Sequence, residues 1–245
     1  MHNRAFQKMA MEEGSHWWFS GRRLLIQEAL YTIDLPENAL ILEVGCGTGG
    51  NLNMLSSLGT VYAFEKNNLA RFIAIDKSHH QIQIEIGSCP NEIPQYDHEF
   101  DLICLFDVLE HIKEDKETIL KLSKLLAQNG KIVITVPAYK WLFSKHDRVL
   151  SHYRRYSRKD IFHLAHTTNF EIHRITHFNF ILAVPIICIR ILSKYLNTPN
   201  SKKIPQLPRI INLILFKIFS LEKFILNKFN IFFGISIFAI LKKED

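Results

Sequence analysis

Cysteine is scarce in this sequence, and its spacing suits neither a metal site nor a disulfide framework. Four cysteines occur in 245 residues, and no two of them form a C-x-x-C pair. Structural zinc sites and small disulfide-stapled domains both need closely spaced or paired cysteines. The sequence therefore predicts neither feature, and it favours reduced thiols in a cytoplasm-like compartment.

Long apolar runs are missing as well. The uncharged stretch between Arg174 and Arg190 has 15 residues, and the one between Lys228 and Lys242 has 13. A bilayer-spanning helix needs roughly 18 or more apolar residues, so neither stretch predicts one. The first 19 residues lack the apolar segment of a secretory signal. With no internal repeat and no low-complexity segment, the chain is expected to form one domain over 1–245.

What the sequence does contain is a regular alternation of strand-like and helix-like segments. The strand-like runs are 39–44, 60–65, 80–87, 100–107, 131–137, 170–178 and 232–243. Helical patterns cover 15–33, 114–128 with a C-cap at Asn129-Gly130, 157–168 with a capping-box start at Ser157, and two stretches within 180–227. Strands that alternate with helices predict an α/β fold with a parallel sheet covered on both faces. The segment 137–156 is expected to be a long functional loop without structure of its own.

A glycine-rich turn follows the first strand in the sequence ILEVGCGTGGNL. Such a turn lets a ligand approach the backbone closely. With Gly50 as the last glycine the spacing is G-x-G-x-x-G, and with Gly49 it is G-x-G-x-G, so the glycines alone do not choose a cofactor. Glu43 precedes the first glycine by two residues. Its carboxylate would repel a pyrophosphate and attract an ammonium group, which favours an amino-acid-bearing nucleoside such as S-adenosylmethionine.

A second acid supports nucleoside binding. Glu65 ends the strand-like run 60–65, 20 residues after Gly45. A carboxylate at this place can accept hydrogen bonds from both ribose hydroxyls. This holds for either cofactor, and a solvated acid at a strand end is the simpler alternative.

The sequences ILEVGCGTG, AFE and IGSCPNEIPQYDHEFDLICLFDVLEHI together resemble the class I S-adenosylmethionine-dependent methyltransferases. The resemblance implies a Rossmann-like, seven-stranded, mostly parallel sheet with an antiparallel last strand and a helical insertion before it. It divides the chain into an N-terminal helical lid (1–36), a cofactor-binding core (37–179), the insertion (180–228) and the last strand (229–245). The implied cofactor-binding residues are Glu43, Gly45, Cys46, Gly47, Gly49, Glu65, Lys66, Ser88, Cys89, Phe106 and Asp107. The family often has Asp where this chain has Ser88, so Ser88 or the backbone around Cys89 is expected to hold the adenine amino group.

The sequence DVLEHI provides the first candidates for chemistry on the acceptor. It is similar to the acid-x-x-Glu-His element of ubiquinone-biosynthesis-type O-methyltransferases, in which such a cluster can carry a divalent cation. The first position here is Asp107, one methylene shorter than the expected Glu, and no metal is predicted. A hydroxyl acceptor needs a base near neutral pH, for which His is the usual choice. The candidates are His111, His146 and His152, with a packed His beside the cofactor loop as the structural alternative for His111.

Positive charge is concentrated in one loop. Residues 140–160 contain seven Lys or Arg and two Asp, whereas the whole chain has a net charge of +6. A nucleic acid would need a broader basic surface, so a compact anion on a small or lipid-linked acceptor is the better interpretation. The alternative is that the arginines pair with Glu12, Glu13 or helix acids. The candidate acceptor-binding residues, which include the aromatic and basic stretch HWWFSGRR, are Trp17, Trp18, Arg22, Tyr139, Arg154 and Arg155.

These observations predict a methyltransferase that acts on a small or lipid-linked anionic acceptor, with a hydroxyl as the expected acceptor group. A NAD-type oxidoreductase and a non-catalytic, membrane-associated scaffold are the competing hypotheses. The apolar segment 180–228, with Lys202, Lys203 and Arg209, suits an acceptor with an apolar tail or contact with a membrane surface. The expected location is cytoplasmic, with membrane association through that segment.

Overall fold

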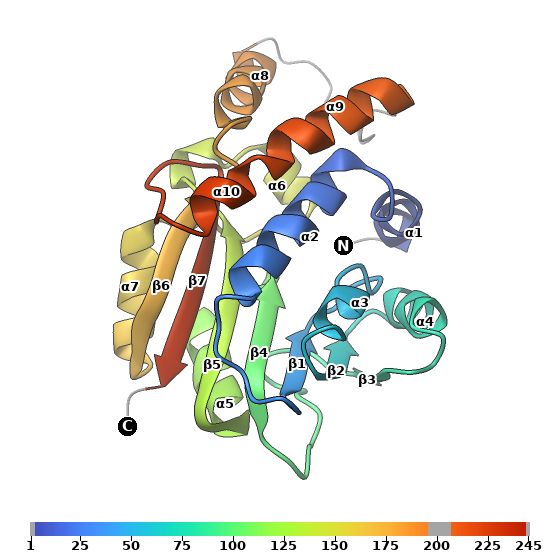
Figure 1. Ribbon diagram of the computed structural model, residues 1–245, viewed down its shortest axis with the longest axis vertical. Coiled ribbons are helices and arrows are strands. Elements are labelled where there is room, and N and C mark those ends of the chain that lie inside the picture. Colours follow the sequence, from blue (N-terminus) through green and yellow to red (C-terminus); the bar gives the residue numbers. More distant parts are fainter. Residues whose placement is uncertain (1–2, 196–206, 244–245) are drawn as a thin grey trace.

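A seven-stranded sheet runs through the middle of the molecule in the computed structural model, which describes residues 3–195 and 207–243 (Figure 1). The strand order is β3-β2-β1-β4-β5-β7-β6. The strands are β1 (Leu40–Val44), β2 (Thr60–Glu65), β3 (Gln83–Ile86), β4 (Phe100–Phe106), β5 (Leu126–Pro137), β6 (Phe170–Phe178) and β7 (Ser236–Lys243). Strand β7 is antiparallel to both β5 and β6, whereas β1 to β5 are mutually parallel. The predicted fold class is confirmed.

Helices cover both faces of this sheet. They are α1 (Asn3–Glu12), α2 (Trp17–Leu30), α3 (Leu52–Leu55), α4 (Asn68–Lys77), α5 (Asp115–Leu122), α6 (Lys145–Val149), α7 (Arg158–Thr167), α8 (Ala183–Tyr195), α9 (Arg209–Ser220) and α10 (Glu222–Leu226), with short 3₁₀ turns at 109–111, 123–125 and 140–142. One core cluster joins α2 and α9 to the sheet, and a second joins α5 and α7 to it. Strands β1, β4 and β5 contribute to both clusters, which explains the apolar runs LIL in β1, LICLF in β4 and IVITV in β5.

Several predicted elements match the structure closely. Strands β2 and β6 occupy the predicted ranges 60–65 and 170–178. Helix α7 begins with the predicted capping box, in which the Asp160 carboxylate accepts a hydrogen bond from the Ser157 backbone N–H at 2.7 Å. The local patterns that define these elements are therefore sufficient to place them.

Two expectations about local structure are wrong. The helix predicted over 114–128 ends at Leu122, and Asn129-Gly130 lies inside β5 instead of capping a helix. A Cβ on Gly130 would lie 2.9 Å from the carbonyl oxygens of Ala127 and Phe100, so glycine is needed here for close backbone approach at an irregularity of the strand. The segment 137–156 is also not structureless, because it contains the turn 140–142 and helix α6.

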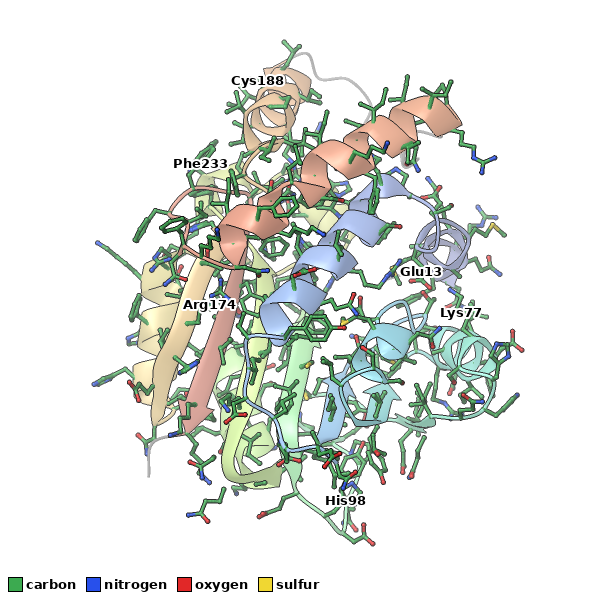
Figure 2. The ribbon with its side chains drawn as sticks, in the orientation of Figure 1. Glu13, Lys77, His98, Arg174, Cys188 and Phe233 are labelled. Carbon is green, nitrogen blue, oxygen red and sulfur yellow. The ribbon has the colours of Figure 1, made fainter. Side chains whose placement is uncertain are left out.

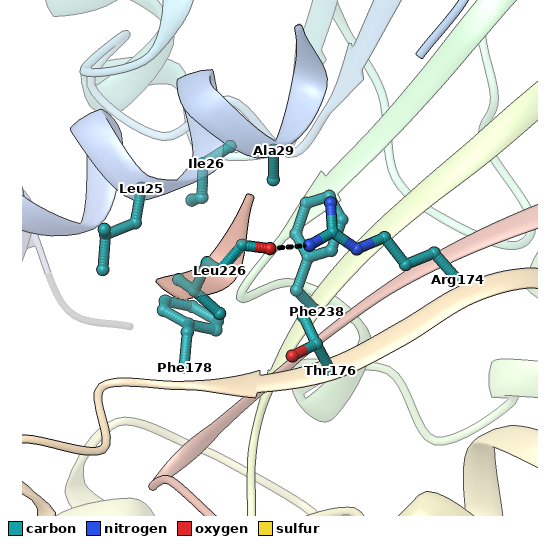
Figure 3. Close-up of a pocket in the computed structure, with 8 residues that line it drawn as sticks. All are labelled: Leu25, Ile26, Ala29, Arg174, Thr176, Phe178, Leu226 and Phe238. Atoms are coloured by element: carbon teal, nitrogen blue, oxygen red, sulfur yellow. Dashed lines mark hydrogen bonds between the residues drawn. The ribbon is translucent and has the colours of Figure 1, made fainter. Parts of the chain in front are cut away.

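The insertion packs against α2 and against the edge of the sheet formed by β6 and β7. Phe219 of α9 is fully buried, and the buried Glu222 of α10 accepts hydrogen bonds from the backbone N–H groups of Asn179 and Ile181. Arg174 of β6 donates a hydrogen bond to the Leu226 carbonyl (Figure 3). The gap beside this contact has a volume of only about 10 Å³, so it is a packing defect and not a ligand site.

The contact between α2 and α9 depends on a glycine. A Cβ on Gly21 would overlap the ring of Phe219, so these two helices approach as closely as they do because position 21 has no side chain. We predict that Gly21→Val destabilises the protein by about 1–3 kcal/mol through overpacking. Gly14→Val is the matched control, because a Cβ there has no atom within 4 Å. Thermal unfolding of both variants checks the prediction, and equal melting temperatures for the two would contradict it.

Candidate active site

The glycine turn after β1 has three residues in the left-handed backbone region. Gly45, Gly47 and Gly49 have φ values of 64°, 58° and 81°, and Gly50 is not among the glycines with positive φ. L-residues rarely adopt this conformation, so these three glycines are required by the turn itself. The spacing in use is therefore G-x-G-x-G. Hydrogen bonds from Gly45 N and Cys46 N to the Phe64 carbonyl hold the turn against the end of β2.

Glu43 lies beneath this turn as a buried carboxyl group. The residue is 2% exposed, and its Oε1 accepts a hydrogen bond from Asn51 Nδ2 at 3.0 Å. Its Oε2 is buried and has no hydrogen-bond partner among the described residues. Burial raises the pKa of Glu43 to about 8. A buried carboxyl with a free oxygen is suited to a cation, which would stabilise the ionised form.

Glu65 reaches the same turn from the end of β2. Its two oxygens accept hydrogen bonds from Gly47 N at 3.0 Å and from Asn67 N at 2.8 Å. Each carboxylate oxygen has a second lone pair, so Glu65 can also accept from hydroxyl groups. The unpartnered oxygen of Glu43, the turn of glycines without side chains and the Glu65 carboxylate together fit a nucleoside that carries an ammonium group.

The N-terminal helices lie against the glycine turn. The Glu13 carboxylate accepts a hydrogen bond from Thr48 Oγ1 at 2.8 Å and forms an ion pair with Lys77 of α4 (Figure 2). Arg23 of α2 donates to the Gly50 carbonyl at 2.7 Å. A Cβ on Gly47 would lie 3.2 Å from the Met9 side chain of α1. These contacts place α1 and α2 over the glycine turn, and the assignment of residues 1–36 as a lid stays a prediction.

The other residues expected to bind the cofactor lie on loops and strand ends around the same turn. Lys66 is exposed and directly follows Glu65, and Cys46 is buried within the glycine turn. Ser88 exchanges two backbone hydrogen bonds of 2.8 Å with Glu92, and its hydroxyl donates to the Glu92 carboxylate at 2.9 Å. Ser88 and the adjacent Cys89 therefore sit in a closed turn after β3, and Phe106 is half-buried at the end of β4.

Arg22 and Asp107 form an ion pair at the carboxyl ends of the strands. Asp107 follows β4 with a φ of 56°, and Arg22, only 6% exposed, reaches it from α2. Arg22 also donates to Ser236 Oγ at 2.8 Å and lies 4.7 Å from the centre of the Phe178 ring. The sequence predicts that Arg22 binds the acceptor and, by the family resemblance, that Asp107 binds the cofactor. In the structure these two side chains form an ion pair, so a ligand that contacts one of them also contacts the other or breaks the pair.

Two of the three candidate bases are neighbours. The rings of His111 and His152 lie 4.5 Å apart and nearly perpendicular, and His152 Nδ1 is 3.3 Å from Asp147 Oδ1. Burial, followed by the nearby His152, lowers the pKa of His111 to about 4, so this ring is neutral near pH 7. His146 is exposed on α6, apart from the ring contact between the other two.

Glu110 completes this cluster. Its carboxylate and the two imidazoles each offer a ligand atom, and these atoms lie within 4.8 Å of one another. Burial, followed by the charge of Asp107, raises the pKa of Glu110 well above its usual range. Asp107 is not one of the three clustered residues, because Arg22 holds its carboxylate. The residues of the acid-x-x-Glu-His element therefore make two separate contacts. Asp107 pairs with Arg22, whereas Glu110 and His111 cluster with His152.

The two loop arginines have different surroundings. Arg155 is 4% exposed, and its Nε donates to the fully buried Asp147 carboxylate at 2.8 Å. Burial alone would raise the pKa of Asp147, but hydrogen bonds and the charge of Arg155 hold it below its usual range. Arg154 is more accessible and pairs with Asp115 of α5 at 2.5 Å. From the sequence, the loop arginines could either bind an anion or pair with acids of the protein. In the structure both Arg154 and Arg155 pair with acids that lie on helices. Neither acid could be identified from the sequence. Asp115 is 39 positions from Arg154, and Asp147 lies within the basic loop itself, where its burial is not apparent.

An open groove of about 550 Å³ borders this loop. Lys116, Lys140 and Arg154 contribute positive charge to its wall, and Tyr153 and Phe143 contribute aromatic rings. Asp115 and Asp160 are the acids in the lining, and they pair with Arg154 and Lys140 respectively. The groove therefore keeps an overall positive and aromatic character.

The aromatic candidates line the boundary between α2, α9 and the sheet. Trp18 stacks on Phe219 with ring centres 6.0 Å apart, and Trp17 meets the same ring edge-on at 5.8 Å. Tyr139 stacks on His177 at 5.7 Å. All of these rings are in packing contacts, so these aromatic side chains are part of the packed fold.

Comparison with known proteins agrees with this geometry. The sheet order, the reversed last strand and the glycine turn define the class I S-adenosylmethionine-dependent methyltransferase fold. A family model described as a methyltransferase domain matches residues 18–175, and the chain belongs to this family. It is therefore a methyltransferase with S-adenosylmethionine as its cofactor, and the comparisons give no support to a nicotinamide-dependent oxidoreductase.

Individual relatives are distant. An uncharacterized protein of Methanocaldococcus jannaschii, MJ0638, is 29% identical over 99 residues, which span 40% of this chain and 40% of that protein. The Bacillus halodurans protein BH2331 is similar in structure, with a TM-score of 0.63, 15% identity, and coverage of 90% of this chain and 99% of that one.

Two other similar structures contain S-adenosylhomocysteine. A Haemonchus contortus phosphoethanolamine N-methyltransferase has a TM-score of 0.58 and 15% identity, with coverage of 90% of this chain and 52% of that one. The magnesium protoporphyrin IX methyltransferase of Synechocystis has a TM-score of 0.55 and 14% identity, with coverage of 91% and 84%. At these identities the likeness establishes the fold and leaves the acceptor open.

The free oxygen of Glu43 leads to a prediction about cofactor binding. Near pH 7 the carboxyl of the free protein is mostly protonated, and a bound ammonium group would favour its ionised form. Binding should therefore release a proton, and affinity should rise by up to about tenfold per pH unit until pH 8 and then level off. Titration calorimetry with S-adenosylhomocysteine, in two buffers of different ionisation enthalpy, measures this release directly.

Glu43→Gln should weaken binding at least tenfold and abolish the proton release. The same change should not destabilise the free protein at pH 8, because burial disfavours the charged carboxylate that it removes. Glu37→Gln, at an exposed position, is the control. Wild-type binding that is independent of pH and releases no proton would rule out this role for Glu43.

Proposed function

We propose that this methyltransferase transfers a methyl group to a hydroxyl of an anionic acceptor, either a small molecule or the head group of a lipid. The observation that carries the proposal is the Asp147–His152–His111 arrangement beside the carboxyl end of β4. S-adenosylmethionine supplies an activated methyl group on a sulfonium. The residues of this chain then have three tasks, which are to hold the cofactor, to remove the proton of the hydroxyl and to position the anion.

The glycine turn and its two acids would hold the cofactor. Glu43 would face the ammonium group, the backbone of Gly45, Gly47 and Gly49 would allow close approach, and Glu65 would accept hydrogen bonds from the ribose. Ser88 and the turn around Cys89 would border the adenine. This assignment is supported by the unpartnered oxygen of Glu43 and by the position of Glu65 at the end of β2.

His152 is the better candidate for the base. Its Nδ1 faces the Asp147 carboxylate, which can orient the ring and stabilise the imidazolium that forms when the other nitrogen takes a proton. Asp147 is itself fixed by Arg155 and by the N–H and hydroxyl of Ser144 at 2.9 Å. His111 has a depressed pKa and would stay neutral beside it. His146 has no comparable orienting contact in the structure described.

The anionic part of the acceptor would lie in the groove next to His152. Tyr153 and Arg154 follow His152 directly in the chain, and both line the groove together with Lys116 and Lys140. Arg154 can release Asp115 for a phosphate or carboxylate because it remains about one-third exposed. Arg155 is buried in its contact with Asp147, so we assign it a positioning role in place of direct acceptor binding.

Transfer of labelled methyl groups from S-adenosylmethionine into fractionated polar and lipid extracts of the source organism tests the proposal. We expect label in an anionic fraction, and we expect His152→Asn to reduce the transfer rate by about 10² to 10⁴. The affinity for S-adenosylhomocysteine, measured by calorimetry, should be unchanged in this variant. His166→Asn, at an exposed position of α7, is the matched control. Full transfer activity in His152→Asn, or label confined to cationic products, would refute the proposal.

A further inference from the structure

One face of helix α9 packs against α2 and the residues that precede it. Asn212 accepts a hydrogen bond from Trp17 N at 2.8 Å and donates one to the Ser15 carbonyl at 2.7 Å. Phe219 is fully buried against Gly21 and Trp18 of α2. This inner face fixes the helix to α2, so the position of α9 is determined by the fold.

The outer face of α9 is apolar too. Its stripe of exposed large side chains continues into α10, and the members are Ile210 (73% exposed), Leu213 (51%), Ile214 (50%), Leu221 (53%) and Phe224 (64%). The spacing of three, four and seven residues places them along one side of the helix. A helix on the surface of a water-soluble domain normally has polar residues there, so the outer face of α9 is unusual for exposure to water.

Helix α8 and the segment before β7 repeat this pattern. Ala183, Ile186 and Ile187 pack inward with Leu142 and Tyr139. The exposed side chains nearby are Val184, Ile189, Ile191, Leu192, Phe229, Phe232 and Phe233. Of the 23 exposed large hydrophobic residues among those described, 14 lie between 184 and 233. We call this surface, formed by α8, α9, α10 and residues 229–233, the apolar face.

The exposed charged side chains within the described part of the apolar face are all positive. Arg209, Lys217 and Lys228 are exposed within it. In the described parts of this region, 183–195 and 207–233, Glu222 is the only acid, and it is fully buried. The sequence adds Lys202 and Lys203 between the two parts, outside the described residues. Apolar side chains mixed with exposed cations complement a surface that is apolar inside and anionic at its rim.

The apolar face is linked to the methyl-transfer site by direct contacts. Phe219 on the inner side of α9 stacks on Trp18, Trp18 lies 5.6 Å from the Arg22 guanidinium, and Arg22 pairs with Asp107. In Figure 1, α8 and α9 lie at the end of the molecule toward which the parallel strands point. An acceptor in a surface that binds the apolar face would therefore lie near the carboxyl ends of the strands.

We propose that the apolar face docks the protein on the surface of an anionic lipid bilayer, with α8 and α9 lying in the plane of the interface. Among the described residues no helix is long and apolar enough to cross a membrane. The docking itself is independent of the methyl-transfer chemistry. Its use in presenting a lipid-linked acceptor rests on the proposed function.

Vesicle flotation with the full chain tests the docking. Wild-type protein should float with vesicles of phosphatidylcholine that contain about one-third phosphatidylglycerol, and much less with phosphatidylcholine alone. Ile210→Ser with Ile214→Ser should reduce binding at least tenfold. Lys217→Gln with Lys228→Gln should reduce binding to the anionic vesicles by about fivefold per lysine and should make the residual binding less sensitive to salt than wild-type binding.

The matched control is Phe162→Ser, because Phe162 is an exposed large side chain on α7, outside the apolar face. It should bind vesicles like the wild type. All variants should retain wild-type affinity for S-adenosylhomocysteine, which shows that they are folded. Failure of the methyl-transfer proposal would appear in the labelling experiment and would leave flotation unaffected, so the two proposals can fail separately.

Three results would overturn the docking proposal. One is the absence of flotation with anionic vesicles while the protein binds S-adenosylhomocysteine normally. Another is equal binding to neutral and anionic vesicles, which would exclude the assigned role of the cations. The third is a dimer in sedimentation that the Ile210 and Ile214 substitutions dissociate, with no vesicle binding, which would assign the apolar face to a second copy of this chain.

Discussion

The buried charge of Arg22 is the constraint on which the rest of the site depends. A guanidinium removed from water costs several kcal/mol unless it is paired and hydrogen-bonded. Asp107, Ser236 Oγ and the faces of Trp18 and Phe178 supply that compensation together. Because these partners come from the loop after β4, from β7, from α2 itself and from β6, the contacts of this one side chain fix α2 over the carboxyl ends of the strands.

Once α2 is fixed in this way, the positions of the two parts of the proposed acceptor site follow from it. On one side, the tryptophans that precede Arg22 form the surface on which α9 packs, so the apolar face acquires its position relative to the strand ends. On the other side, Asp107 is occupied, and the neighbouring Glu110 and His111 are left to cluster with His152. A methyltransferase with this arrangement has its basic groove and its apolar face near the same edge of the sheet, which suits an acceptor that is anionic at one end and apolar at the other.

Much of the fold could be predicted from the sequence, because its strands and its cofactor turn are encoded locally. The run 60–65 and the glycine-rich turn after the first strand are apparent without knowledge of their neighbours, whereas the choice between Gly49 and Gly50 as the third glycine of the turn needed the backbone angles. The contacts that define the acceptor side could not be predicted, because they join distant residues: Arg22 and Asp107 are 85 positions apart. The pairing of Arg155 with Asp147 was hidden for a different reason. A loop rich in charge appears solvated until its helix and its buried acid are known.

The central claim is that the turn after β1 receives the ammonium-bearing S-adenosyl cofactor and not a dinucleotide. Thermal unfolding of the whole chain with each ligand is the most direct test. S-adenosylhomocysteine at 100 times its Kd should stabilise the protein by about 2.7 kcal/mol, and NAD at the same concentration should leave the melting temperature unchanged. Stabilisation by NAD, with none by S-adenosylhomocysteine, would contradict the account.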